Sequence, residues 1–385
     1  MNITPSQSAA SRSRTLVFHI GDPKTGSTSI QRTLFDGTWS SGASSIAYPD
    51  TIDALPLAKA LLQDGDPRQR ETLLRNMAGW LDARDDDVAV ISAEHFSDVP
   101  PEALQAAIRE HLSRHAGDLR IVAYVRPHVS RLLSSYTQRV KARGLAQDLE
   151  SFCRAAASQG RFRYAPRFLA WRRVFGDAFT LRPMVMSELW RSDVVADFLH
   201  TVLGSDDFTI DSTGQANVTP TLDHLACLRE VHAALKRAGT ANDVRLALGR
   251  NLAALLTATS PEGARLKMPR SLLPDLQAAY AADAAETDAA FFTTTPLSDA
   301  LAASGASTTD EAQPLTLAER FPEEKCRTLQ AAIAGIAAEL QRDPDRWKRQ
   351  FRQNKRLKSG SNEQETETVQ RINAQLRALC QLMTE

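Results

Sequence analysis

The chain has 385 residues, 43% of them hydrophobic and 24% charged, which is the composition of a globular protein with a substantial core. Its 46 basic and 46 acidic residues balance, so the overall charge gives no indication of nucleic-acid binding. The four cysteines form no CxxC pair and have no histidine at metal-ligand spacing, so we expect free thiols in a reducing compartment and no metal site.

The first 14 residues are rich in serine and contain no apolar stretch, so we expect a disordered tail at 1–14 rather than a signal peptide. No run of apolar residues in the sequence is long enough to span a membrane. These features together predict a cytoplasmic protein.

The segment from residue 15 to residue 35 has three distinct parts. An apolar, β-branched and aromatic run at 15–20 predicts a buried strand. The next residues predict a turn, because Gly21 and Gly26 can supply unusual backbone angles. Helical spacing follows, with Ile30 and Leu34 one turn apart.

Farther along the chain, nearly continuous apolar runs predict strands, and amphipathic spacing predicts the helices between them. The expected strands lie at 45–48, 87–92, 119–125 and 179–185. The expected helices lie at 28–35, 53–63, 70–81, 101–115, 129–141, 149–157, 164–175, 194–203 and 222–236. This alternation predicts an α/β protein of three layers, α/β/α, around a central parallel sheet.

Three charged residues fall just past the ends of expected strands. Lys24 follows the strand at 15–20, Glu94 the strand at 87–92, and Arg126 the strand at 119–125. Ligands of parallel α/β sheets bind at the carboxyl ends of the strands, so we expect these segments to meet in one crevice.

The character of the chain changes past residue 297. Residues 298–318 are small and polar and predict a linker, and 319–385 predict a helical C-terminal extension. Residues 342–358 of this extension hold eight basic side chains with two aromatic ones between them. This segment is either a solvated helical face or a contact for an acidic ligand or a membrane surface.

The turn around Lys24 has the features of an anion site. A strand, a glycine-flanked loop with a lysine and a helix start place backbone N–H groups, the positive helix end and one ammonium together. It is not a Walker loop, since that motif has lysine directly after its second glycine, whereas Ser27 follows Gly26 here. The other interpretation is an ordinary glycine turn with a solvated lysine.

A second basic anchor follows the strand at 119–125. Ser134 comes eight residues after Arg126, near the second turn of the expected helix. A guanidinium and a hydroxyl near one helix start suit a phosphate group.

The order Pro-Lys-Thr-Gly-Ser-Thr from Pro23 and the pattern Arg-x7-Ser-x-Tyr from Arg126 resemble two cofactor motifs of sulfotransferases that use 3′-phosphoadenosine 5′-phosphosulfate (PAPS). The resemblance covers roughly residues 15–292 and includes the segment YAPRFLAWRRVFGD at 164–177. It implies a P-loop-like sulfotransferase fold for 15–297. It also implies transfer of a sulfuryl group from PAPS to a hydroxyl of a glycan, glycolipid or other small-molecule acceptor, with adenosine 3′,5′-bisphosphate as product.

The resemblance also implies roles for individual residues. The 5′-phosphosulfate would be held by Lys24, Thr25, Gly26, Ser27 and Thr28, and the 3′-phosphate by Arg126 and Ser134. The sequence departs from the eukaryotic cytosolic enzymes in two ways: Pro127 directly follows the arginine, and the RKGxxGDW loop has no counterpart. The contacts to adenine are therefore unassigned.

Sulfuryl transfer depends mainly on positioning and on neutralising charge, as phosphoryl transfer does. Lys24 would stabilise the leaving oxygen, and a base must take the proton of the acceptor hydroxyl. Glu94 and His95 are the candidates for the base, and the resemblance favours Glu94. His19, inside a strand, is expected to be structural.

Two other classes of protein stay open. One is a sulfotransferase-like protein that binds a nucleotide or a glycan without catalysis. The other is a P-loop kinase, which would need a Walker lysine and a magnesium-binding carboxylate that are not visible at the expected places. No nucleic-acid partner is expected, since the sequence has no reader motif.

Overall fold

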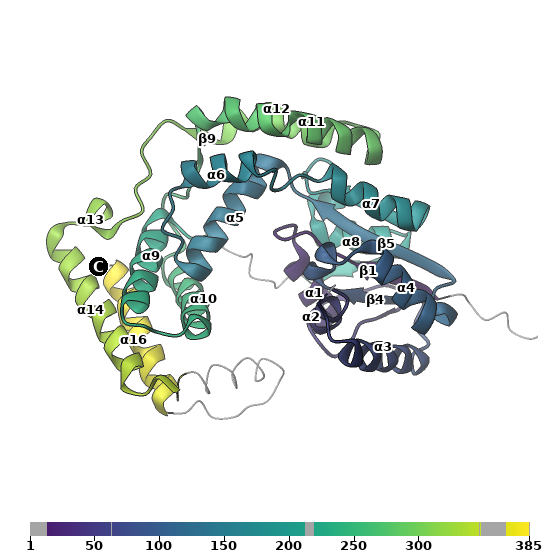
Figure 1. Cartoon of the computed structure of the whole chain (residues 1–385), viewed down its shortest axis with the longest axis horizontal. Helices are drawn as coiled ribbons and strands as arrows, with labels where there is room; N and C mark the ends of the chain where they lie inside the picture. The colour runs from purple at the N-terminus through teal and green to yellow at the C-terminus, as the bar shows by residue number, and fades with distance from the viewer. Residues whose placement is uncertain (1–13, 63, 212–218, 346, 348–366, 385) are drawn as a thin grey trace, which may run out of the picture. The chain divides into compact units, whose positions relative to one another are not determined.

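The computed structural model describes residues 14–62, 64–211, 219–345, 347 and 367–384 (Figure 1). Contacts between residues divide the chain into two compact units. The first unit consists of Met1–Pro127, Arg163–Gly214 and Ala281–Leu301, and the second of His128–Phe162, Gln215–Tyr280 and Ala302–Glu385. The predicted tail lies outside the described residues except for Arg14, and the predicted domain boundaries stay predictions.

A sheet of five parallel strands forms the centre of the first unit, in the order β3-β4-β1-β5-β6. The strands are β1 (Thr15–His19), β3 (Ile46–Ala47), β4 (Val88–Ser92), β5 (Asp118–Val125) and β6 (Phe179–Pro183). They confirm the five predicted strands. Every residue of β1 and β4 is buried, as expected for strands with both faces covered.

Helices cover both faces of this sheet, which confirms the three layers. On one face, α1 (Ser27–Asp36) and α8 (Val194–Leu203) share a core with Val17. On the other face, the Phe179 ring stacks on Phe168 of α7 (Ala165–Phe175), and α7 packs on α4 (Pro101–His111). The fold is therefore α/β with a central parallel sheet.

Smaller elements complete the first unit. They are the helices α2 (Leu55–Ala60), α3 (Pro67–Asp82) and α12 (Pro296–Ala302), the 3-10 turns η1 (Glu94–Asp98), η2 (Ser113–His115), η3 (Gly176–Ala178) and η4 (Trp190–Ser192), and the antiparallel strands β2 (Trp39–Ser40) and β7 (Thr209–Ile210).

The second unit is mainly helical. Its helices are α5 (His128–Arg143), α6 (Leu149–Ser158), α9 (Leu222–Arg237), α10 (Asn242–Thr259), α13 (Leu317–Arg320), α14 (Glu323–Arg342) and α16 (Glu367–Thr384). Short parallel strands β8 (Met268–Pro269) and β9 (Thr308–Thr309) pair with each other, and η5 (Arg270–Leu272) is a 3-10 turn. Helix α11 (Leu273–Phe291) begins in the second unit and ends in the first.

The C-terminal helices belong to the core of the second unit. Leu329 of α14 and Leu376 of α16 lie in one buried cluster with Leu228 of α9 and Leu252 of α10. The segment expected as a linker, 298–318, contains the end of α12, the turn η6 (Ala303–Ser307) and β9. Most of the basic segment at 342–358 lies outside the described residues.

Two expectations from composition can be compared with the structure. All four cysteines are free and buried, which confirms the expected thiols. Of the helices that the structure describes, none combines the length and the apolar character that crossing a membrane requires.

Candidate functional site

The turn from Gly21 to Gly26, here called the anion loop, joins the carboxyl end of β1 to α1. Gly21 has a φ angle of 61° and Gly26 one of 84°, which confirms the predicted unusual angles. A Cβ on Gly21 would lie 2.8 Å from the Cα of Glu94, and one on Gly26 would lie 2.7 Å from Cγ1 of Val194. Both positions therefore need glycine for the backbone angle and for the close approach.

The N-terminus of α1 faces the anion loop without a side-chain cap. Gly26 is the N-cap residue, no side-chain hydrogen bond caps the described helix, and its first turn holds no acidic residue. The buried Oγ of Ser27 also has no hydrogen-bond partner among the described residues. Uncapped N–H groups and an unused hydroxyl at a positive helix end fit an anionic ligand.

Lys24 occupies a strained position in the loop. Its φ angle is 73°, a left-handed conformation that costs a residue with a Cβ about 1–2 kcal/mol. Its carbonyl oxygen accepts a hydrogen bond of 3.4 Å from Nη1 of Arg126. The structure thus brings the predicted residues Lys24 and Arg126 together at the edge of the sheet.

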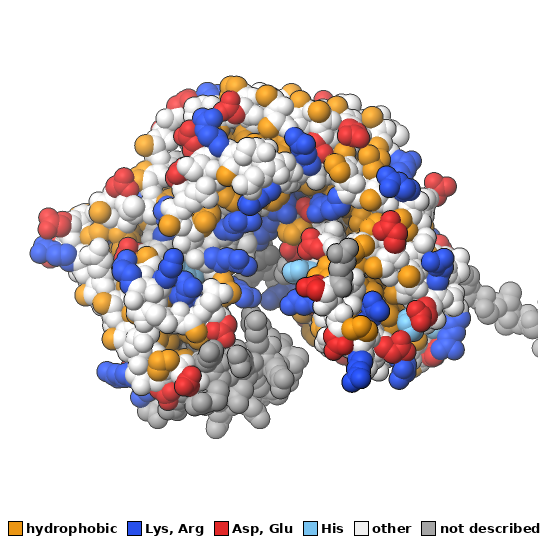
Figure 2. Space-filling model, viewed as in Figure 1, with side chains coloured by type: hydrophobic (Ala, Val, Ile, Leu, Met, Phe, Trp, Pro, Cys, Tyr) orange, Lys and Arg blue, Asp and Glu red, His pale blue; other side chains and the backbone are white. Residues whose placement is uncertain are grey.

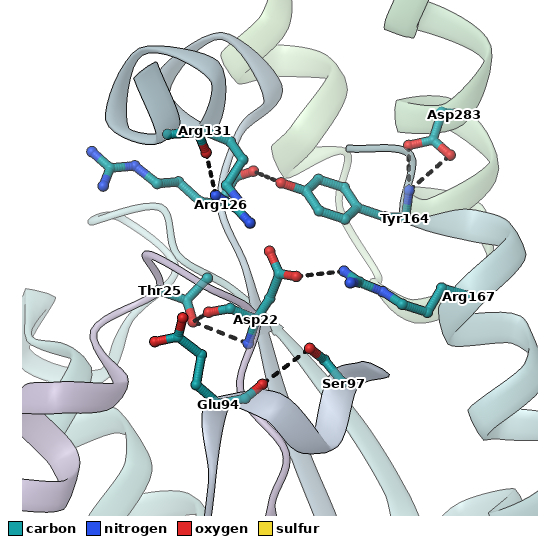
Figure 3. Close-up of polar contacts among 10 residues, drawn as sticks. Asp22, Thr25, Glu94, Ser97, Arg126, Arg131, Tyr164, Arg167 and Asp283 are labelled. Carbon is teal, nitrogen blue, oxygen red and sulfur yellow. Dashed lines mark hydrogen bonds and ion pairs between the residues drawn. The ribbon is translucent and has the colours of Figure 1, made fainter. Parts of the chain in front are cut away.

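The two threonines of the motif lie in different surroundings. The Thr25 hydroxyl is buried and donates a hydrogen bond of 2.6 Å to the carbonyl oxygen of Asp22, inside the loop (Figure 3). This side chain therefore fixes the loop, and the main-chain N–H is what Thr25 offers a ligand. Thr28 is exposed on the first turn of α1.

Glu94 lies directly beside the anion loop. It opens η1 immediately after β4, and its carbonyl oxygen accepts a hydrogen bond of 3.0 Å from Ser97 Oγ. Its side chain turns toward Thr25 and Asp22 in Figure 3. His95 is the next residue on the same turn and is exposed. The structure therefore places the Glu94 carboxylate next to the loop.

An ion pair that the sequence did not predict joins the loop to α7. Asp22 is 1% exposed, and its Oδ1 accepts a bond of 2.6 Å from Nη2 of Arg167 on α7. The Arg167 guanidinium also lies over the ring of Phe168, 4.5 Å from its centroid. The pair neutralises a buried carboxylate inside a loop suited to an anion. No local signal joins these residues, which are 145 positions apart.

Tyr164 supports the main chain at Arg126, and the sequence analysis gave it no role. Its hydroxyl donates a hydrogen bond of 2.6 Å to the carbonyl oxygen of Arg126. The Asp283 carboxylate of α11 accepts N–H bonds from Tyr164 at 2.8 Å and from Ala165 at 3.0 Å (Figure 3). The start of α7 is thereby fixed beside Arg126.

A buried polar cluster lies where β1, β4 and α1 meet. Nδ1 of His19 is 2.8 Å from Ser92 Oγ, which also accepts a bond of 3.1 Å from Nε2 of Gln31. Burial lowers the pKa of His19 to about 3, so the imidazole is neutral. The cluster joins the two strands that lead into the anion loop and Glu94.

Ser134 belongs to the second unit. It lies half-buried on α5, and its role toward a 3′-phosphate stays a prediction from the sequence resemblance.

Comparisons with known proteins give few matches. No protein-family model matches the chain, and no curated protein is significantly similar to it. Among solved structures, the chain is similar to a sulfotransferase from Alicyclobacillus acidocaldarius, with 16% sequence identity and a TM-score of 0.43. This match covers 72% of this chain and 95% of that chain. A function has to be argued from the residues of the site.

Proposed function

We propose that this chain is a sulfotransferase that transfers a sulfuryl group from PAPS to a hydroxyl of an acceptor. The observation that carries the proposal is the anion loop. Its strained Lys24, the uncapped start of α1 and the unused Ser27 hydroxyl converge at the carboxyl end of a central strand. The lysine stands two positions before Gly26, which distinguishes the loop from the Walker loop of kinases.

The residues of the loop fit the phosphosulfate end of the cofactor. Main-chain N–H groups, the Ser27 and Thr28 hydroxyls and the Lys24 ammonium are donors suited to its several anionic oxygens. When bound, PAPS supplies an activated sulfuryl group. Arg126 and Ser134 are proposed for the 3′-phosphate on the strength of the sequence resemblance.

The residues of this chain then act by charge and by proton transfer. Lys24 neutralises negative charge as it develops on the leaving oxygen. Arg167 holds the Asp22 carboxylate and reduces its repulsion of an anion in the loop. Glu94 takes the proton of the acceptor hydroxyl, and His95 is the alternative base.

The acceptor proposed from the resemblance is a glycan, a glycolipid or another small molecule with a hydroxyl group. A cytoplasmic location is also proposed, and the four free, buried cysteines agree with a reducing compartment.

Calorimetry with adenosine 3′,5′-bisphosphate and with AMP tests the nucleotide site. We expect the bisphosphate to bind more tightly by about 1.5–3 kcal/mol, since a charged contact from Arg126 distinguishes the 3′-phosphate. The variant Arg126→Gln should lose this difference. Arg75→Gln, which removes an exposed guanidinium paired with Glu71, should keep it.

Equal affinities of the wild type for the two nucleotides would contradict the proposal. Mass spectrometry of acceptor mixtures incubated with the protein and PAPS then separates an enzyme from a binding protein. A protein that binds the bisphosphate but adds no sulfuryl mass to any acceptor would support the non-catalytic alternative.

A further inference from the structure

A stripe of arginines on α5 has no part in the proposed chemistry. Arg131, Ser135, Arg139 and Arg143 follow one another at intervals of four, so they lie along one side of the helix. Arg161, from the loop after α6, lies near enough to repel Arg139. The name arginine stripe is used here for Arg131, Arg139 and Arg143 of α5 together with Arg161. Figure 2 shows Lys and Arg side chains gathered over this part of the second unit.

Three of the four arginines, Arg139, Arg143 and Arg161, carry charges that no described carboxylate balances. Burial lowers the pKa of Arg139, and repulsion from Arg161, Arg143 and Arg131 lowers it further. Within the described part of the chain, no carboxylate lies within ion-pair distance of Arg139, Arg143 or Arg161. Like charges four residues apart on a helix destabilise it, so the stripe has a cost that an anionic ligand would offset.

Acidic residues of the neighbouring helices are engaged elsewhere. Glu150 of α6 pairs with Arg154 at 3.0 Å, and Glu230 of α9 pairs with Arg237 at 2.9 Å. Asp148 caps the start of α6.

The loop that carries Arg161 is held in one conformation. The Arg161 N–H donates a bond of 2.9 Å to Ala156, and its carbonyl oxygen accepts one of 2.8 Å from the Tyr280 hydroxyl. Gly160 and Phe162 on either side have φ angles of 61° and 64°. A left-handed phenylalanine is strained, and such strain is concentrated at functional sites.

Two phenylalanine rings hold guanidinium groups of the stripe. Arg131 lies over Phe162, 4.9 Å from the ring centroid, and Arg139 lies over Phe152 at 5.4 Å. These contacts restrict the side chains before any ligand binds and so reduce the entropy lost on binding.

We propose that the arginine stripe is a binding site for an acidic oligosaccharide, which it holds through carboxylate, phosphate or sulfate groups.

A membrane surface or a nucleic acid fits the stripe less well. Among the described residues, the large apolar side chains that are exposed all belong to the first unit: Phe35, Ile52, Met186 and Trp190. A helix that lies in a membrane interface buries an apolar face there in addition to its basic contacts with lipid. The rings of Phe152 and Phe162 lie under guanidinium groups, so they are not presented for stacking with bases.

Two triple variants of equal charge test the inference. Arg139→Gln, Arg143→Gln and Arg161→Gln together remove the unpaired part of the stripe. The control combines Arg154→Gln, Arg237→Gln and Arg270→Gln, which remove three exposed guanidinium groups of the same unit that already pair with carboxylates.

The probes are hexasaccharides of hyaluronan, which carries carboxylates, and of chondroitin sulfate, with neutral maltohexaose beside them. We expect the stripe variant to weaken binding of the acidic probes about tenfold and the control variant less than about twofold. Maltohexaose should bind weakly to all three proteins. Equal losses in the two variants would overturn the inference, as would preferential binding to phosphatidylserine vesicles or to a DNA oligonucleotide.

Binding of adenosine 3′,5′-bisphosphate separates this inference from the proposed function. The stripe variant should bind the nucleotide as the wild type does. If it loses the nucleotide and keeps the acidic probes, the stripe belongs to the nucleotide site and the inference is wrong. If the wild type binds no bisphosphate yet binds acidic probes through the stripe, the proposed function fails and the acidic-ligand site stands.

Discussion

Lys24 and Glu94 follow β1 and β4, and the parallel pairing of these strands brings the two residues to one edge of the sheet. His19 at the end of β1 pairs with Ser92 at the end of β4. The Gly21 backbone then approaches the Cα of Glu94 so closely that no side chain fits between them. The residue that carries a positive charge and the residue proposed as base therefore reach the site from adjacent strands, each fixed by its own turn.

Replacing Lys24 should separate binding from chemistry. We expect Lys24→Ala to reduce turnover about 100-fold or more, because the ammonium acts most strongly where negative charge develops. Affinity for adenosine 3′,5′-bisphosphate should fall less than about tenfold, since the loop amides and α1 remain. Initial rates and calorimetry on the same variant measure both effects. A loss of nucleotide affinity as large as the loss of turnover would show that Lys24 only binds.

Glu94 and His95 can be distinguished by conservative replacements. Glu94→Gln keeps the shape of the side chain, removes the base and should lower turnover about 100-fold or more. His95→Gln changes an exposed side chain on the same turn and should have little effect on turnover. The opposite result would move the role of base to His95.

At the scale of the element, α1 has a left-handed glycine at each end, and the two glycines meet different surroundings. Gly26 caps the start and Gly37 the end, with φ angles of 84° and 64°. A Cβ on Gly37 would have nothing within 4 Å, whereas Cβ atoms on Gly26 and Gly21 would contact Val194 and Glu94. The end of the helix thus needs glycine for its angle alone, and the anion loop also needs it for space.

Alanine substitutions at Gly21 and Gly37 should reveal this difference. Gly37→Ala should cost about 1–2 kcal/mol of unfolding free energy, from the backbone angle alone. Gly21→Ala adds a collision with the main chain of Glu94 and should cost about 2–5 kcal/mol, with a loss of nucleotide binding. Denaturant unfolding and calorimetry measure the two quantities. Similar losses of stability in both variants would mean that the loop has room for a side chain.

The elements that the sequence predicted have strong local signals. The strands β1, β4 and β5 are dense apolar runs, and α1 and α8 have distinct apolar faces. The prediction omitted α11, because alanines on all sides of that helix leave no clear apolar stripe. It also omitted α10, whose Gly249 is a residue of low helix propensity. The structure has room only for glycine at this position, because a Cβ there would lie 2.4 Å from Nε2 of His232.

The site was predictable in the same uneven way. Lys24, Glu94 and Arg126 could be proposed from the sequence because each follows a strand that is visible there. The pair of Asp22 with Arg167 was not found, because it depends on how α7 packs on the sheet. Contacts of this kind follow from tertiary packing, which no local pattern encodes.

At the scale of the whole molecule, both units contain buried histidines whose pKa is lowered by burial. In the first unit, burial lowers the pKa of His19 to about 3, from 6.5. In the second unit, burial is also the main cause of the lowered pKa values of His224 and His232. Each of these imidazoles takes up a proton more readily in the unfolded chain than in the native protein.

Stability should therefore fall in mild acid. Below the unfolded pKa of about 6.5, the unfolded state binds more protons than the native state, so the free energy of unfolding decreases as the pH falls. For His19 alone, the loss reaches about 2 kcal/mol at pH 5, and it continues to grow until the pH nears the folded pKa of about 3. Thermal melting should show a clear fall in Tm from pH 7.5 to pH 5 and little change from pH 8 to pH 7.5.

His19→Asn, whose amide can still contact Ser92, should show a smaller fall over the acid range, because asparagine does not titrate. A wild-type Tm that stays constant down to pH 5 would contradict the burial of these neutral histidines, and an unchanged acid response in His19→Asn would assign the effect to the second unit.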